Sequence, residues 1–198
     1  MNFKKLFFAA VIVLSANASF GQDSETANHN VTINIPNIAL LDLEFTTGIA
    51  IALEGEVTGD EAGLPMSFIN DKAKNSDTWI NYTSIVSKSA LTTRNVTVSL
   101  DDNGDAVPDG LKLTVTAGAY AGGEGAGDLG TPVASPIEIT STATNIIDAI
   151  GSAYTGNTAG RGHQLTYQLG YAGTVTDFAD LDSDVSAVLK IVYTLSDI

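Results

Sequence analysis

The 198-residue chain contains no cysteine. This absence excludes disulfide bonds, thiolate metal ligands, cysteine nucleophiles and lipid attachment through an N-terminal cysteine. Positive charge is also scarce, because 9 Lys and Arg residues stand against 23 Asp and Glu residues and the formal net charge is −14. Nucleic acids and anionic membrane surfaces bind proteins through clustered cations, so neither is an expected partner.

Histidine and catalytic motifs are scarce too. The two histidines, His29 and His163, show no zinc-like ligand spacing, and no G-x-S-x-G motif accompanies them. His163 lies in a glycine-rich stretch, where a solvated loop residue is expected. We therefore assign no catalytic residue and no organic cofactor site, and predict that the protein is not an enzyme.

The sequence has one long apolar run, at residues 6–14, which follows Lys4 and Lys5 and precedes small residues up to Gly21. The run is too short to cross about 30 Å of hydrocarbon as a helix. This order of segments is typical of a secretory signal peptide. We predict a signal peptide at 1–21, a polar leader at 22–29 and a single domain at 30–198. The mature chain is then expected, without a membrane span, in the periplasm, on the cell surface or outside the cell.

Apolar and polar residues alternate along much of the remaining chain. Val31, Ile33 and Ile35 alternate with polar residues, and Pro36 would end that strand. Eight further segments have strand-like patterns, at 39–45, 49–53, 78–86, 95–100, 111–117, 137–141, 164–171 and 185–195. Short strands at such spacing predict an all-β fold, an antiparallel β-sandwich of about nine strands.

Three other segments bear on this prediction. Residues 144–150 contain Ile146, Ile147 and Ile150 at helix-like spacing, which predicts at most one short helix, with a buried strand as the alternative. The glycine-rich tracts at 118–130 and 151–162 predict long surface loops.

The most specific local pattern is an acidic run that has the spacing of a calcium loop. Oxygen-bearing side chains occupy positions one, three, five and nine of such a loop, at Asp101, Asn103, Asp105 and Asp109. The run resembles the aspartate-rich loops of thrombospondin type 3 repeats. Lys112 stands where a bidentate carboxylate would complete the ligand set, and a polar hairpin turn is the alternative. If Ca²⁺ binds, we expect it to rigidify the loop.

The acidic composition, the N-terminal segment and the apolar closing strand at 188–195 resemble those of bacterial surface and pilus-type proteins, such as the spore-coat-U and fimbrial-subunit group. The ending at 192–197 is similar to the closing strand of WxL-type surface domains, with Tyr193 in place of the Trp. The resemblance implies an Ig-like or pilin-like sandwich that is assembled or displayed at the cell surface.

This resemblance implies a structural or adhesive role. In strand exchange, an N-terminal extension completes the sheet of a neighbouring molecule. Residues 23–35 fit this role, with Val31, Ile33 and Ile35 as the apolar residues of the assembly strand, and pairing within their own sheet is the alternative. We expect an exported, non-enzymatic surface protein that assembles as a fimbria-like subunit with its own copies or with other surface proteins. A secreted carbohydrate- or ligand-binding module, stabilised by calcium, is the alternative function.

Overall fold

The computed structural model describes residues 28–57, 59, 61–90 and 92–198. The predicted signal peptide and most of the polar leader lie outside the described residues. Among the described residues, 28–35 and those from Pro36 onward belong to separate units, and the strands all belong to the second. The strands are β1 (Ile38–Phe45), β2 (Glu56–Val57), β3 (Met66–Ser67), β4 (Lys74–Ile85), β5 (Arg94–Leu100), β6 (Leu111–Ala121), β7 (Ala126–Pro132), β8 (Ile137–Glu138), β9 (Thr144–Tyr154), β10 (Gly162–Tyr171) and β11 (Ile191–Asp197).

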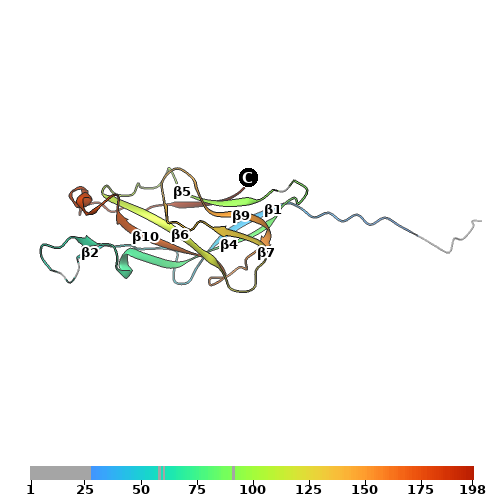
Figure 1. Cartoon of the computed structure of the whole chain (residues 1–198), viewed down its shortest axis with the longest axis horizontal. Coiled ribbons are helices and arrows are strands. Elements are labelled where there is room, and N and C mark those ends of the chain that lie inside the picture. The colour runs from blue at the N-terminus through green and yellow to red at the C-terminus, as the bar shows by residue number, and fades with distance from the viewer. Residues whose placement is uncertain (1–27, 58, 60, 91) are drawn as a thin grey trace, which may run out of the picture. The chain divides into compact units, whose positions relative to one another are not determined.

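Among the described residues all strand pairs are antiparallel, and nine strands join in one hydrogen-bonded sheet while β2 and β3 form a separate hairpin. The large sheet narrows where β4 meets β9, because only two residue pairs connect these strands there. On either side of this junction the strands form two layers, β11-β5-β9-β7 and β1-β4-β10-β6-β8 (Figure 1). The described part of the chain is therefore an all-β antiparallel sandwich, as the strand pattern predicts.

The core lies between the layers and is built by period-two alternation. Inward side chains of β5, such as Val96 and Val98, face those of β6 and β10, such as Val115 and Leu165, and all four are at most 1% exposed. Successive strand residues point to opposite faces, so each of these strands supplies one apolar row. The hydroxyls of Tyr167 on β10 and Tyr193 on β11 meet at 2.8 Å and connect the two layers.

Residues 144–150 form no helix but the first part of strand β9, so the alternative of a buried strand is confirmed. Ile146, Ile147 and Ile150 are all fully buried, yet Ala149 has a φ of 58° and the pairing with β5 changes register nearby. A bulge of this kind resets the inward-outward alternation. The resulting apolar spacing imitates that of a helix.

The glycine-rich tracts are also more regular than predicted. Strand β6 continues to Ala121, and β7 begins within the first tract and runs to Pro132, while β9 extends into the second tract. At Gly127 and Gly130 the φ angles are positive, and an added Cβ would lie within 3 Å of β9 atoms. Glycine here permits close approach of strands instead of forming an open loop.

Four predicted strand segments are wrong or shortened. Residues 31–35 and 49–53 carry no strand. The strand predicted at 137–141 is only the two-residue β8, and the closing strand begins at Ile191 instead of residue 185. The helical content of the described residues is limited to 3₁₀ turns, η2 (Asp71–Ala73) and η3 (Val175–Asp180) among them. None of the described helices is long and apolar enough to span a membrane.

Candidate functional site

The predicted assembly strand is apolar and exposed. Val31, Ile33 and Ile35 are 71%, 81% and 76% exposed, and residues 28–35 belong to no helix or strand. Three β-branched side chains at alternate positions match the apolar face of a strand, but here that face is not buried. Their role in assembly stays a prediction, while the backbone strand expected at 31–35 is absent.

Both layers of the sandwich end in strands that pair on one side only. In one layer these are β1, which pairs with β4, and the short β8, which pairs with β6. In the other they are β11, which pairs with β5, and β7, which pairs with β9. A one-sided strand presents unpaired N–H and C=O groups, which can accept a strand of another chain.

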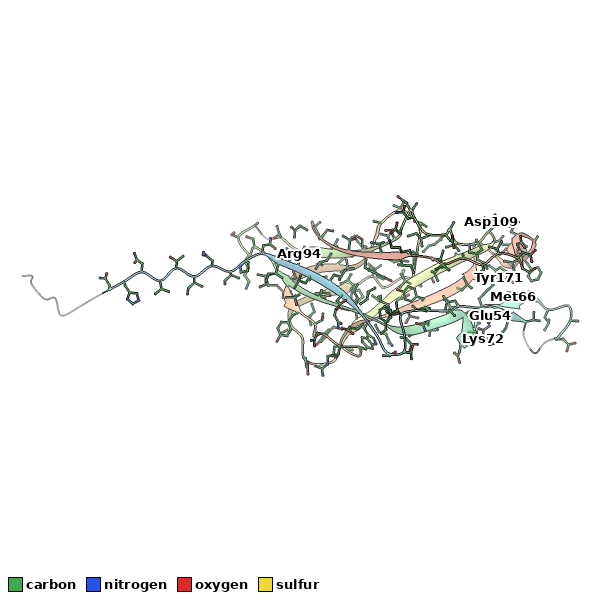
Figure 2. All side chains as sticks on the ribbon, turned by 180° about the vertical axis from the view of Figure 1, so that it is seen from behind. Glu54, Met66, Lys72, Arg94, Asp109 and Tyr171 are labelled. Atoms are coloured by element: carbon green, nitrogen blue, oxygen red, sulfur yellow. The ribbon has the colours of Figure 1, made fainter. Side chains whose placement is uncertain are left out.

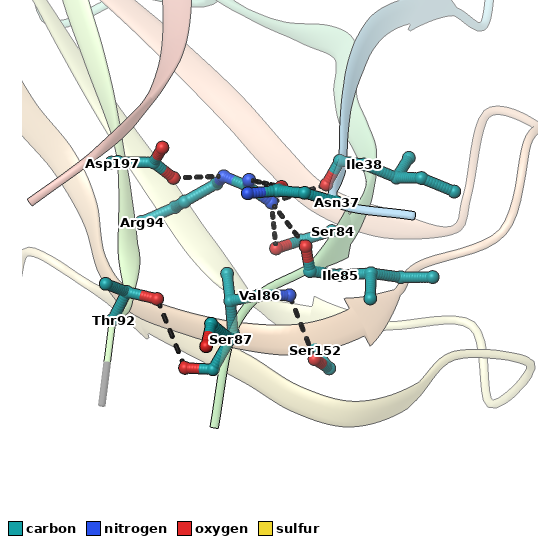
Figure 3. A network of polar contacts seen from close by, with 10 residues as sticks. All are labelled: Asn37, Ile38, Ser84, Ile85, Val86, Ser87, Thr92, Arg94, Ser152 and Asp197. Atoms are coloured by element: carbon teal, nitrogen blue, oxygen red, sulfur yellow. Dashed lines mark hydrogen bonds and ion pairs between the residues drawn. The ribbon is translucent and has the colours of Figure 1, made fainter. Parts of the chain in front are cut away.

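Arg94 organises one end of the sandwich (Figure 3). Its side chain is 3% exposed, and its Nε donates to Asp197 Oδ1 at 2.8 Å. Its Nη1 donates to Ser84 Oγ at 2.9 Å and to the carbonyl oxygens of Ile38 and Ile85, and its Nη2 donates to Asn37 Oδ1. The guanidinium therefore joins the beginnings of β1 and β5 to the ends of β4 and β11. A single arginine in a strand gives no signal of this role in the sequence.

The acidic loop follows β5 and docks a distant segment. Asp101 Oδ2 forms an ion pair with Lys190 Nζ at 2.5 Å. Asp105 Oδ2 accepts a hydrogen bond from the N–H of Val188 at 2.7 Å. The hydrogen bond from Lys190, with further bonds from Asn103, lowers the pKa of Asp101 to about 2. Two of the four predicted calcium ligands are thus engaged with residues 188–190.

The other two predicted ligands are not brought into this contact. Asn103 donates to Asp101 Oδ1, and Asp109 is an exposed residue at the far end of the loop. The described residues contain no group of three or more His, Asp or Glu side chains arranged to hold a metal ion. Calcium binding stays a prediction, and thermal melting in calcium and in chelator tests it.

His163 is buried, so the expectation of a solvated loop residue is wrong. Its side chain is 0% exposed, with Nε2 3.0 Å from the Tyr82 hydroxyl and Nδ1 2.9 Å from the Gly118 carbonyl oxygen. The ring stacks on Tyr82 and meets Tyr120 edge to face. Desolvation lowers the pKa of His163 below 6.5. A neutral imidazole enclosed by its own strands has no access to a substrate.

An apolar pocket lies at the opposite end of the sandwich from Arg94 (Figure 2). Its walls come from the β3 region and from the adjoining ends of β4 and β10, and include Met66, Phe68, Lys74 and Tyr171. Phe68 and Tyr171 meet edge to face with ring centroids 5.0 Å apart. Apolar walls with a few polar groups are common in small-ligand sites.

Comparison with known proteins adds no relative from which a role could be transferred. No protein-family model, no curated protein and no solved structure matches the chain.

Proposed function

We propose that the protein is an exported, non-enzymatic structural or adhesive surface protein whose copies assemble by strand exchange, as in a fimbria-like subunit. Residues 28–35 supply the inserted strand. The observation that carries the proposal is the exposure of Val31, Ile33 and Ile35, which alternate with polar residues in a segment that forms no strand of its own. An added strand gains main-chain hydrogen bonds from a sheet edge and specificity from alternate side chains.

The composition of this segment supports the same role. Residues 28–35 contain no Asp or Glu, although the protein as a whole carries a net charge of −14. Insertion of an uncharged strand therefore adds no carboxylate repulsion at the interface. Exposed β-branched residues are costly to keep in water, and an intermolecular sheet would bury them.

Light scattering after size-exclusion chromatography tests the proposal, on protein purified from cells that express the full sequence. Ile33→Asp places a charge on the apolar face of residues 28–35, and Thr32→Asp places the same charge at the neighbouring polar position. We expect multimers for the unchanged protein and for Thr32→Asp, and monomers for Ile33→Asp. Circular dichroism verifies that both variants remain folded. Monomers of the unchanged protein over the accessible concentration range contradict assembly.

The pocket beside Phe68 and Tyr171 supports a second candidate, a carbohydrate- or ligand-binding module. Apolar walls that include aromatic rings suit the apolar faces of sugar rings. Glycan-array binding by the purified protein tests it, with Tyr171→Ala as the pocket variant. Tyr154→Ala is the matched control, because Tyr154 is a 50% exposed tyrosine that does not line the pocket. Binding that is lost in both variants, or in neither, argues against the pocket.

A further inference from the structure

We infer that the free edge of β11 is the surface that receives residues 28–35 of a second copy. This inference rests on the proposed function and adds to it the accepting strand. The four candidate edges, those of β1, β7, β8 and β11, differ in how far they are protected against pairing.

Three of these edges carry features that discourage an added strand. β8 is only two residues long, so it offers few backbone groups to an added strand. β7 contains a register irregularity between Gly127 and Leu129, positive φ angles at Gly127 and Gly130, and ends at Pro132. Bulges and proline bend an edge away from a partner or remove its donors.

The edge of β1 is protected by charge and by a local hydrogen bond. Thr46 N–H donates to Asp77 O, so the N–H groups of even-numbered β1 residues face β4 and those of odd-numbered residues face outward. One outward N–H, that of Leu43, donates to the carboxylate of Asp42 at 2.8 Å. This occupied donor, with the charges of Asp42 and Glu44, interrupts the edge.

The edge of β11 has no bulge, no proline and no occupied outward donor, and its one charged residue is the last one, Asp197, which pairs with Arg94. Its pairing with β5 continues at both ends, where Ile198 N–H donates to Thr93 O at 3.1 Å and Asp101 N–H donates to Lys190 O at 2.8 Å. Even-numbered residues therefore face β5, and the N–H groups of Ile191, Tyr193, Leu195 and Asp197 face outward. Within the described part of the chain, these four N–H groups have no hydrogen-bond partner.

The side chains along this edge match the inserted strand. Ile191, Tyr193 and Leu195 point toward the core but remain only half-buried. Leu41 and Leu43 of β1, in the other layer, are also half-buried, and β1 lies in contact with β11. A strand added to β11 would place Val31, Ile33 and Ile35 on the same inner face and cover these residues. Thr32 and Asn34 would then lie on the outer face beside Thr194.

Disulfide trapping between two differently labelled copies tests the assignment, because the chain has no cysteine of its own. One copy carries Thr32→Cys and the other carries Thr194→Cys on the outer face of β11. Matched acceptor copies carry Leu40→Cys on β1 or Thr131→Cys on β7, which are also exposed positions. Cross-strand neighbours lie at distances that a disulfide can span. Oxidation of each mixture is followed by electrophoresis without reductant.

We expect a covalent heterodimer with Thr194→Cys, and its loss when Ile33→Asp is added to the donor copy. A heterodimer with Leu40→Cys or Thr131→Cys but not with Thr194→Cys overturns the β11 assignment and leaves strand exchange standing. A chain that carries both Thr32→Cys and Thr194→Cys and closes only onto itself overturns the role of a second copy. Monomers in light scattering, with no heterodimer in any mixture, overturn the proposed function as well.

Hydrogen exchange gives a second readout that does not depend on the introduced cysteines. Assembly is expected to slow exchange at the outward N–H groups of Tyr193 and Leu195 and to leave those of Ala39 and Leu41 unchanged. Slower exchange at the β1 positions alone contradicts the inference.

Discussion

A buried imidazole makes the stability of this protein depend on pH. The pKa of His163 is lowered from its ordinary value of 6.5 by desolvation, so the folded state binds a proton less readily than the unfolded chain. Above pH 6.5 neither state is protonated and the full stability is present. As the pH falls below 6.5, the unfolded state gains a proton first, and the free energy of unfolding decreases until the folded pKa is passed.

Urea unfolding between about pH 7.5 and pH 5 measures this effect, which has a limiting slope of about 1.4 kcal/mol per pH unit for one group. His163→Gln removes the titrating group and is expected to flatten the curve over this range, although it lowers stability at pH 7.5. Equal slopes for the two proteins would show that other groups control the response to acid.

The contacts of Arg94 predict that replacing Arg94 lowers the free energy of unfolding more than replacing its ion-pair partner Asp197. Arg94→Ala removes a buried guanidinium that donates to Asn37, Ser84 and the carbonyl oxygens of Ile38 and Ile85, and we expect a loss of about 2–4 kcal/mol. Asp197→Asn changes a side chain that is 61% exposed, and is expected to cost at most about 1 kcal/mol. Chemical denaturation of both variants measures the difference. Similar losses would mean that the ion pair, and not the carbonyl contacts, supplies the stability.

Neither Arg94 nor His163 could be identified from the sequence as an organising residue. Each depends on groups that are distant in the chain, such as Asp197 for Arg94 and Tyr82 for His163. Alternation places a residue on a face of a strand, but it does not show which strands adjoin that face. The exposed apolar residues of segment 28–35 could be identified, because their pattern is local.

At the scale of elements, the bulge in β9 gives a strand the apolar spacing of a helix. Ala149 has a φ of 58°, a left-handed conformation that is unfavourable for a residue with a Cβ. We expect Ala149→Gly to stabilise the protein by roughly 0.5–1 kcal/mol, since glycine adopts this conformation without that steric cost. Thermal unfolding measures the change.

Ala39→Gly is the matched control for this prediction. Ala39 is an exposed strand residue and is not among the residues with positive φ. Glycine there is expected to destabilise the protein by roughly 0.5–1 kcal/mol. A destabilising effect at both positions would contradict the strain assigned to Ala149.

Strands with an alternating sequence could be predicted well, and strands without one could not. The sequence alternates at 95–100 and 164–171, so the positions of β5 and β10 followed from period two to within two residues, although both strands have register shifts in their pairings. Five of the seven residues of β7 belong to the glycine-rich tract at 118–130 and have little apolar character, so only the pairing with β9 makes this segment a strand. The segment at 185–190 alternates like a strand, yet Lys190 and Val188 are held by the acidic loop.

At the scale of the whole molecule, the net charge of −14 opposes the association of copies. Salt screens this repulsion, since the screening length falls from about 30 Å at 0.01 M to about 3 Å at 1 M. We therefore expect the multimer fraction, measured by light scattering, to rise with sodium chloride concentration over that range. Dissociation by salt would indicate that attractive ion pairs hold the copies together. Ile33→Asp, which should remain monomeric at every salt concentration, is the control.

The position of the Arg94 cluster has a mechanical consequence for an assembled fibre. Tension transmitted through residues 28–35 would enter each subunit at Asn37, where the chain leads directly into β1. A pull along β1 loads its eight residue pairs with β4 together, in shear, instead of separating them one after another. Arg94 binds Asn37 and Ile38 to β4 and β11 at the point of entry, so the load is shared between both layers before β1 can slide.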